Sequence, residues 1–83
     1  MIRHIIQDQL GIHARPAGQI VKLASGFSSE IKFSTASKTV DAKRIMGLMG
    51  LGTHKGVELT VTFEGADEAV AAKAFSEFLK ESL

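Results

Sequence analysis

Hydrophobic and polar residues alternate most strictly in the second half of the chain. Val57, Leu59, Val61 and Phe63 occupy every second position, and glutamate or threonine fills each position between them. Successive side chains of a β-strand point to opposite faces of a sheet, so this alternation is typical of a strand with one buried face and one wet face. It predicts a strand over residues 57–64.

Three more segments have the patterns of strands. Residues 2–7 are rich in isoleucine and are followed by the polar pair Asp8-Gln9, which suits a strand that ends there. Residues 31–35 alternate between apolar and polar side chains. Residues 38–40 can return beside them as the second strand of a hairpin.

Apolar residues recur at helical spacing in the remaining segments. A first helix is expected to begin within a residue or two of His13, because Pro16 is tolerated in the first turn of a helix, and to end near Gly26. A short second helix is predicted over residues 41–51. A third helix starts at Asp67-Glu68 and has an apolar stripe formed by Ala71, Ala74, Phe75, Phe78 and Leu79.

These segments follow one another in the order β-α-β-β-α-β-α. Each strand has one apolar face and the helices are amphipathic, so the helices are expected to cover the same face of one sheet. The predicted fold class is α+β, a two-layer open-faced sandwich in which three helices cover one face of a four-stranded antiparallel sheet. Because 83 residues are too few for a second core, one domain over residues 1–83 is expected.

The composition argues against several classes of protein. The chain has no cysteine, which excludes disulfides and thiolate zinc sites. A net charge of +1 and the lack of tyrosine and tryptophan argue against a nucleic-acid partner. No apolar run is long enough to span a bilayer, and the first residues lack the apolar core of a signal peptide. We expect a soluble, cytoplasmic monomer that needs no cofactor.

The three histidines differ in their settings. His4 shares a strand face with Ile2 and Ile6 and is expected to be partly covered by packing. His54 lies in a glycine-flanked loop and is expected to be solvated. No pair of histidines has metal-ligand spacing with a carboxylate, so no metal site is predicted.

His13 stands where a helix is expected to begin, and this position suggests phosphate chemistry. A residue that caps a helix faces the unpaired N–H groups of the first turn, here those of Ala14 and Arg15, at the positive end of the helix dipole. The guanidinium of Arg15 also matches phosphate oxygens, and imidazole is a nucleophile near neutral pH. Gly11 would let the preceding loop turn tightly. This geometry suits a phosphohistidine site, but on residue types alone an ordinary surface helix cap with a nearby arginine is the favoured interpretation.

Two segments of the chain match known motifs. The run Gly11-Ile12-His13-Ala14-Arg15-Pro16-Ala17 resembles the active-site signature of the histidine-containing phosphocarrier (HPr) family of the bacterial phosphoenolpyruvate:sugar phosphotransferase system. Residues 42–52 resemble the second motif of that family. The resemblance implies a carrier without turnover chemistry of its own. The resemblance also implies that His13 accepts a phosphoryl group on Nδ1 from the phosphoenolpyruvate-dependent first enzyme and passes it to sugar-specific acceptor domains.

The second motif is also expected to supply part of a docking surface. A helix of about two turns cannot bury all its apolar residues, and Leu48 and Leu51 are the ones expected in the core. Exposed methionines suit a surface that must fit several partners. The resemblance implies that donor and acceptor dock on Gly18 and Lys22 of the first helix and on Ile45, Met46 and Met49. Arg44 heads the short helix, where its positive charge calls for an anion, either Asp41 nearby or an acidic patch on a partner. In the second case Arg44 is expected to strengthen docking.

Two positions depart from the family pattern. Many members have a serine where this chain has Arg44, and a dedicated kinase phosphorylates that serine in low-GC Gram-positive species. Arg44 offers no hydroxyl, so kinase control of this type is in doubt. Leu10 stands where small polar residues are usual, so the hydrogen bonds of the active-site loop are expected to differ. A regulatory docking module and a relay branch that serves regulation remain alternatives to sugar uptake.

Overall fold

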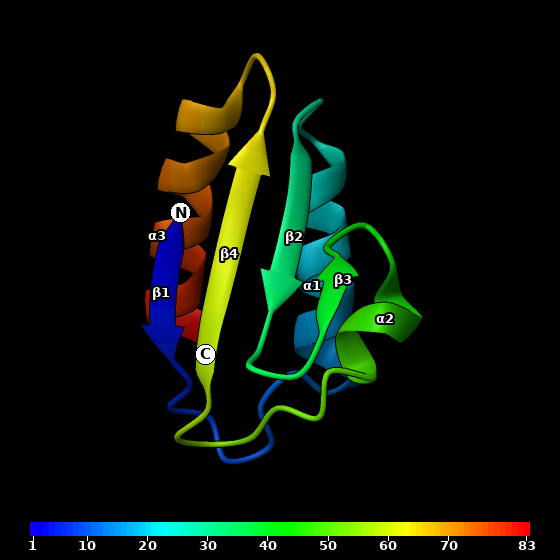
Figure 1. Ribbon diagram of the computed structural model, residues 1–83, viewed down its shortest axis with the longest axis vertical. Helices are drawn as coiled ribbons and strands as arrows, with labels where there is room; N and C mark the ends of the chain where they lie inside the picture. The colour runs from blue at the N-terminus through cyan, green and yellow to red at the C-terminus, as the bar shows by residue number, and fades with distance from the viewer.

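The computed structural model describes all residues from Met1 to Leu83. Seven elements follow the predicted order (Figure 1). They are β1 (Ile2–Ile5), α1 (Ala14–Ser25), β2 (Glu30–Ser34), β3 (Thr39–Asp41), α2 (Ile45–Met49), β4 (Glu58–Glu64) and α3 (Glu68–Ser82).

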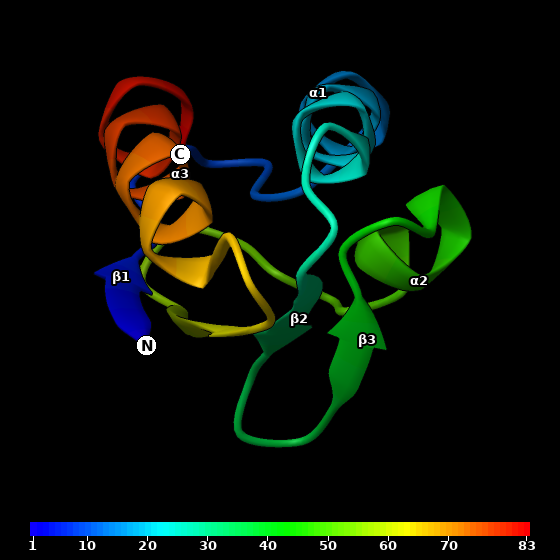
Figure 2. The ribbon, with the colours of Figure 1, turned by 90° about the horizontal axis from the view of Figure 1, so that it is seen from above.

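The strands form one antiparallel sheet in the order β1-β4-β2-β3. β4, the strand with the strictest alternation, lies inside the sheet, where its Val61 pairs with Ile2 on one side and Phe33 on the other. Figure 2 shows α1 and α3 side by side over one face, with α2 beside β3. The opposite face carries no helix, which confirms the predicted open-faced sandwich.

The core lies between the sheet and the two long helices. The inward-facing side chains of β2 and β4 are fully buried except that of Phe63, which is half-buried, whereas the polar residues that alternate with them lie on the open face. Phe75 of α3 lies at the centre, with its ring 5.8 Å from those of Phe33 and Phe63 and 6.3 Å from that of Phe78. The other large, fully buried side chains are Ile6, Ile20, Ile31, Leu48, Leu59, Leu79 and Val61.

Two elements are shorter than the sequence pattern predicts. β1 ends at Ile5, not at Gln7, although Ile6 still exchanges hydrogen bonds with the β4 side of the sheet, through Val57 O (3.0 Å) and Gly56 N (2.8 Å). α2 is confined to Ile45–Met49, because the residues before it form a turn. In that turn the side chain of Asp41 accepts the N–H of Lys43, 2.8 Å away.

Asp67 joins two turns that are far apart in sequence. Its carboxylate accepts the N–H groups of Ser28 (2.8 Å) and Ser29 (2.9 Å) and the hydroxyl of the buried Ser29. Opposite, a Cβ on Gly65 would lie 2.7 Å from Cα of Ser29, and the φ of Gly65 is +153°, so a side chain fits poorly there. The bonds from Ser29 and Ser28 lower the pKa of Asp67 from 3.8 to about 2.

The Asp67 contacts make stability dependent on pH in acid. A group whose pKa falls on folding adds stability above its unfolded pKa, here 3.8, and loses that stability as the pH falls through about 2. The Asp67→Asn variant should therefore melt below the parent at pH 5, and the gap in Tm should narrow towards pH 2. Thermal unfolding followed by circular dichroism from pH 5 to 2 measures this, with Glu77→Gln as the control for an exposed carboxylate. A gap that stays constant over this range would contradict the assignment.

Candidate functional site

His13 is the N-cap residue of α1, as its place in the sequence predicts. Its backbone is extended, with φ −97° and ψ −170°, and its carbonyl accepts the N–H of Ala17 at 2.9 Å. The imidazole makes no capping bond and no other hydrogen bond, and the residue is half-buried. The backbone therefore holds His13 at the helix end, while both ring nitrogens stay available.

The first turn of α1 presents two free donors. The N–H groups of Ala14 and Arg15 have no acceptor, Pro16 has no N–H, and Ala17 makes the first hydrogen bond of the helix. Both Ala14 and Arg15 are exposed. Their N–H groups lie at the positive end of a 12-residue helix, which is a favourable place for an anion.

Arg15 adds a cation beside these donors. Its side chain is exposed and makes no hydrogen bond or ion pair, since the one ion pair in the structure joins Lys32 and Glu30. A free guanidinium can give two parallel hydrogen bonds to phosphate oxygens. The structure thus brings a free imidazole, two free N–H groups and a free guanidinium together at one end of α1.

The loop before His13 is fixed by contact with the loop that follows α2. Ile12 is buried, and its N–H donates to Oγ1 of Thr53 at 2.9 Å. Gly11 has a φ of +64°, and a Cβ there would lie 2.4 Å from the carbonyl oxygen of Thr53. The tight turn expected at Gly11 is therefore present, and it has a second cause, because the two backbones approach too closely for a side chain.

Thr53 is a site residue that the sequence does not reveal. It is half-buried in an irregular loop, 41 positions from Ile12, and no local pattern marks its role. Leu10 is 68% exposed, and its N–H donates to the side chain of Asp8 at 2.8 Å. The side-chain hydrogen bonds that hold this loop come from Asp8 and Thr53, and Leu10 contributes none.

The expected docking residues lie on two helices that pack against each other. Arg15, Gly18 and Lys22 follow one face of α1, and a Cβ on Gly18 would meet nothing within 4 Å. In α2, as expected, Leu48 and the adjacent Leu51 are buried, whereas the other apolar residues are exposed. The exposed ones are Ile45 (42%), Met46 (77%) and Met49 (42%).

Arg44 is the N-cap of α2 and makes no side-chain bond. Asp41 is not its counter-ion, because no ion pair joins them and the Asp41 carboxylate accepts the N–H of Lys43. A cation at a helix N-terminus is unfavourable unless an anion is near. Arg44 is therefore a free positive charge beside the exposed side chains of α2.

The other two histidines lie apart from these groups. His4 is half-buried on the helix-covered face of β1, as expected, and its Nε2 is buried without a hydrogen-bond partner. His54 is exposed, as expected, with Nδ1 3.0 Å from the carbonyl oxygen of Lys55. No three histidine or carboxylate side chains lie close enough to hold a metal ion, and none of the helices could cross a bilayer.

Comparison with known proteins identifies relatives over almost the full length. The family model described as the phosphotransferase-system (PTS) HPr component phosphorylation site matches residues 2–81. HPr of Thermoanaerobacter tengcongensis is 40% identical, with coverage of 95% of this chain and 89% of its own and a TM-score of 0.88. The histidine-containing phosphocarrier of Mycoplasma is 37% identical, with coverage of 92% and 86% and a TM-score of 0.88. Crh of Bacillus subtilis, a catabolite repression protein crystallised as an intertwined dimer with a swapped domain, is 33% identical, with coverage of 100% and 98% and a TM-score of 0.80.

The contact with Thr53 should contribute measurably to stability. Thr53→Val keeps the shape of the side chain but leaves the N–H of Ile12 without its acceptor, at an expected cost of about 1–3 kcal/mol. Gly11→Ala should cost more, because it forces alanine into a left-handed backbone and places its Cβ against the Thr53 carbonyl. Urea unfolding measures both, and Thr53→Ser, which keeps the hydroxyl, is the matched control. Equal stability of the Val and Ser variants would show that the hydrogen bond is not needed.

Proposed function

Because the chain belongs to the HPr family of phosphocarrier proteins of the phosphotransferase system, we propose that His13 carries a phosphoryl group on Nδ1. The group comes from the phosphoenolpyruvate-dependent first enzyme and passes to sugar-specific acceptor domains, in the cytoplasm. The observation that carries this proposal is the free imidazole of His13, which lies beside two unpaired N–H groups and the free guanidinium of Arg15.

The chemistry is an exchange of one phosphorus bond for another. The lone pair of Nδ1 attacks the phosphorus as the bond to the donor breaks, and the donor keeps the electron pair of that bond. The phosphoryl oxygens then lie near the N–H groups of Ala14 and Arg15 and the Arg15 guanidinium, which stabilise the negative charge. The reverse attack by an acceptor completes the relay.

An exposed cradle suits a carrier better than a deep site would. The phosphoryl group must be released to the next protein, so the site has to stabilise it without enclosing it. Ala14 and Arg15 are exposed, so a partner's nucleophile can reach a phosphoryl group held beside them. Positioning and electrostatic stabilisation supply most of the catalysis of phosphoryl transfer, and here the partner can contribute part of both.

We propose that donor and acceptor dock on the surface formed by Gly18 and Lys22 of α1 and Arg44, Ile45, Met46 and Met49 of α2. Gly18 leaves space for a partner's side chain beside α1. The flexible apolar side chains of α2 can fit more than one partner, and Lys22 and Arg44 favour acidic ones. We propose the monomer as the working form, since one chain completes both the sheet and the core.

A regulatory docking module is a second candidate, and the similarity to Crh, a catabolite repression protein, favours it. Such a module would use the fold and the exposed face of α2 without carrying a phosphoryl group. The presence of both His13 and Arg15 at the end of α1 supports the relay instead. A labelling experiment separates the two.

Incubation with the first enzyme and phosphoenolpyruvate should add one acid-labile phosphoryl group of about 80 Da, read by intact mass spectrometry. His13→Ala should abolish the gain, because no other histidine has free N–H donors and a guanidinium beside it. His4→Ala and His54→Ala are the matched controls and should label fully. No mass gain in the parent would favour the docking module, and full labelling of His13→Ala would place the site elsewhere.

The docking role of Arg44 is tested by reversing its charge. Arg44→Glu should weaken binding to the first enzyme roughly fivefold at low ionic strength, with the difference fading as salt is added, because salt screens exposed charges. Tm should hardly change, since the side chain of Arg44 makes no hydrogen bond or ion pair within the chain. Calorimetric titration across a salt series measures this, and Lys73→Glu on α3 makes the same charge change as a control. Equal affinities at all salt concentrations would remove Arg44 from the docking surface.

A further inference from the structure

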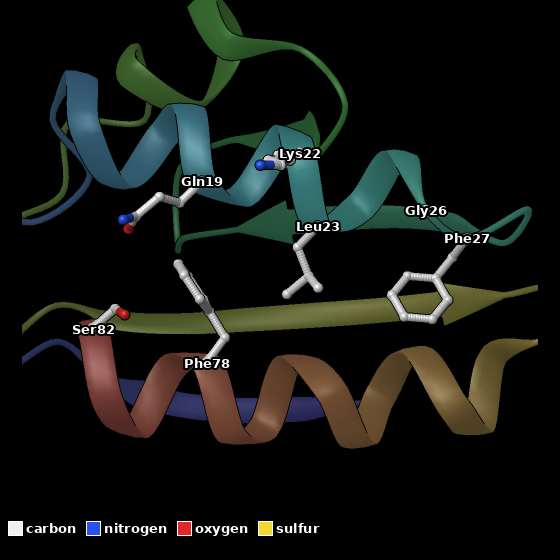
Figure 3. Close-up of a pocket in the computed structure, with 7 residues that line it drawn as sticks. All are labelled: Gln19, Lys22, Leu23, Gly26, Phe27, Phe78 and Ser82. Carbon is white, nitrogen blue, oxygen red and sulfur yellow. The ribbon is translucent and has the colours of Figure 1, made fainter.

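A groove between α1 and α3 lies outside the phosphoryl site. Its volume is about 570 Å³, within the range of roughly 300–1,000 Å³ that is usual for small-molecule sites. Figure 3 shows Leu23 and Phe27 from the α1 side and Phe78 from α3 reaching into the space between the helices. All three are half-buried against the core, so they form fixed apolar walls that water still reaches.

Three polar side chains also line the groove, and only one of the three is charged. The amide of Gln19 and the hydroxyl of Ser82 lie at one end of the groove, and neither makes a hydrogen bond within the chain (Figure 3). Lys22 supplies the single charge of the lining, and its ammonium has neither a hydrogen bond nor an ion pair. No carboxylate lines the groove, so Lys22 is the only formally charged side chain in its lining.

We propose that this groove binds a small amphipathic anion, a linear alkyl chain that ends in a carboxylate. The chain would lie between Leu23 and Phe78 towards Phe27, and the carboxylate would take the Lys22 ammonium and the Gln19 amide. From Gln19 to Gly26 the helix rises about 10 Å, which limits the occupant to a chain of about eight carbons. A ligand of this size in an open groove is expected to have a Kd near 1 mM.

Lys22 connects this groove to the proposed docking surface. It lines the groove and also lies on the face of α1 that includes Arg15 and Gly18. A carboxylate held by Lys22 would neutralise a charge that an acidic partner uses, so the occupied protein should dock more weakly. This consequence depends on the proposed function, whereas ligand binding itself does not.

Titration with octanoate, followed by ¹H–¹⁵N NMR of the full chain, tests the proposal without any partner. Saturable shift changes should be confined to residues 19–27 and 78–82. Octan-1-ol has the same chain without the charge and should bind at least fivefold more weakly. Changes centred on the exposed α2 residues or on Leu10, or equal binding of the alcohol, would overturn the proposal, as would the absence of any saturable change up to 10 mM.

Substitutions separate the charge from the apolar walls. Lys22→Gln should weaken octanoate binding at least fivefold and leave octanol binding unchanged, while Lys80→Gln, an exposed lysine of α3 outside the groove, should alter neither. Leu23→Ala should weaken both ligands. If Leu23→Ala fails to fold, the two lysine variants still test the anion site, because both lysines are exposed and their substitution should not disturb folding. Equal octanoate affinity of Lys22→Gln and the parent would exclude the assigned anion site.

Discussion

The contact between the Gly11-Ile12 backbone and Thr53 sets the position of His13. Two loops meet there, one before α1 and one after α2, and the approach leaves no room for a side chain on Gly11. The hydrogen bond from Ile12 to Thr53 fixes the residue next to His13, so the imidazole reaches the helix end without a hydrogen bond of its own. A ring held by its own capping bond would have one nitrogen occupied.

The rest of the fold holds these two loops in place. Ile6 bonds to Val57 and Gly56, and the carbonyl of Leu83 accepts the N–H groups of Gln7 and Asp8, so the first loop starts from a fixed point. The second loop leaves α2, which packs against α1. The proposed docking face of α2 and the Thr53 contact therefore belong to one short segment, so a partner bound to α2 would lie close to the residues that position His13.

The helices and strands follow from local pattern, because their periods of two and 3.6 residues reflect which face is buried. Alternation along residues 57–64 located the central strand β4, and Pro16 placed the start of α1 beside His13. The same reasoning predicts that Leu48 is buried and Met46 is exposed, because a short helix buries only one of its sides. The sequence does not predict the role of Thr53, the contacts of Asp67 or the lining of the groove. Each of these features depends on contacts between residues far apart in sequence, and such contacts produce no repeating pattern along the chain.

The central claim is that the end of α1 supplies the hydrogen bonds that receive the phosphoryl group. It is tested most directly by ¹H–¹⁵N NMR of the protein before and after phosphorylation by the first enzyme and phosphoenolpyruvate. The amide protons of Ala14 and Arg15 have no acceptor in the unphosphorylated protein, so both should move strongly downfield when phosphoryl oxygens accept them. A fully phosphorylated His13 with these two amides unmoved would contradict the account.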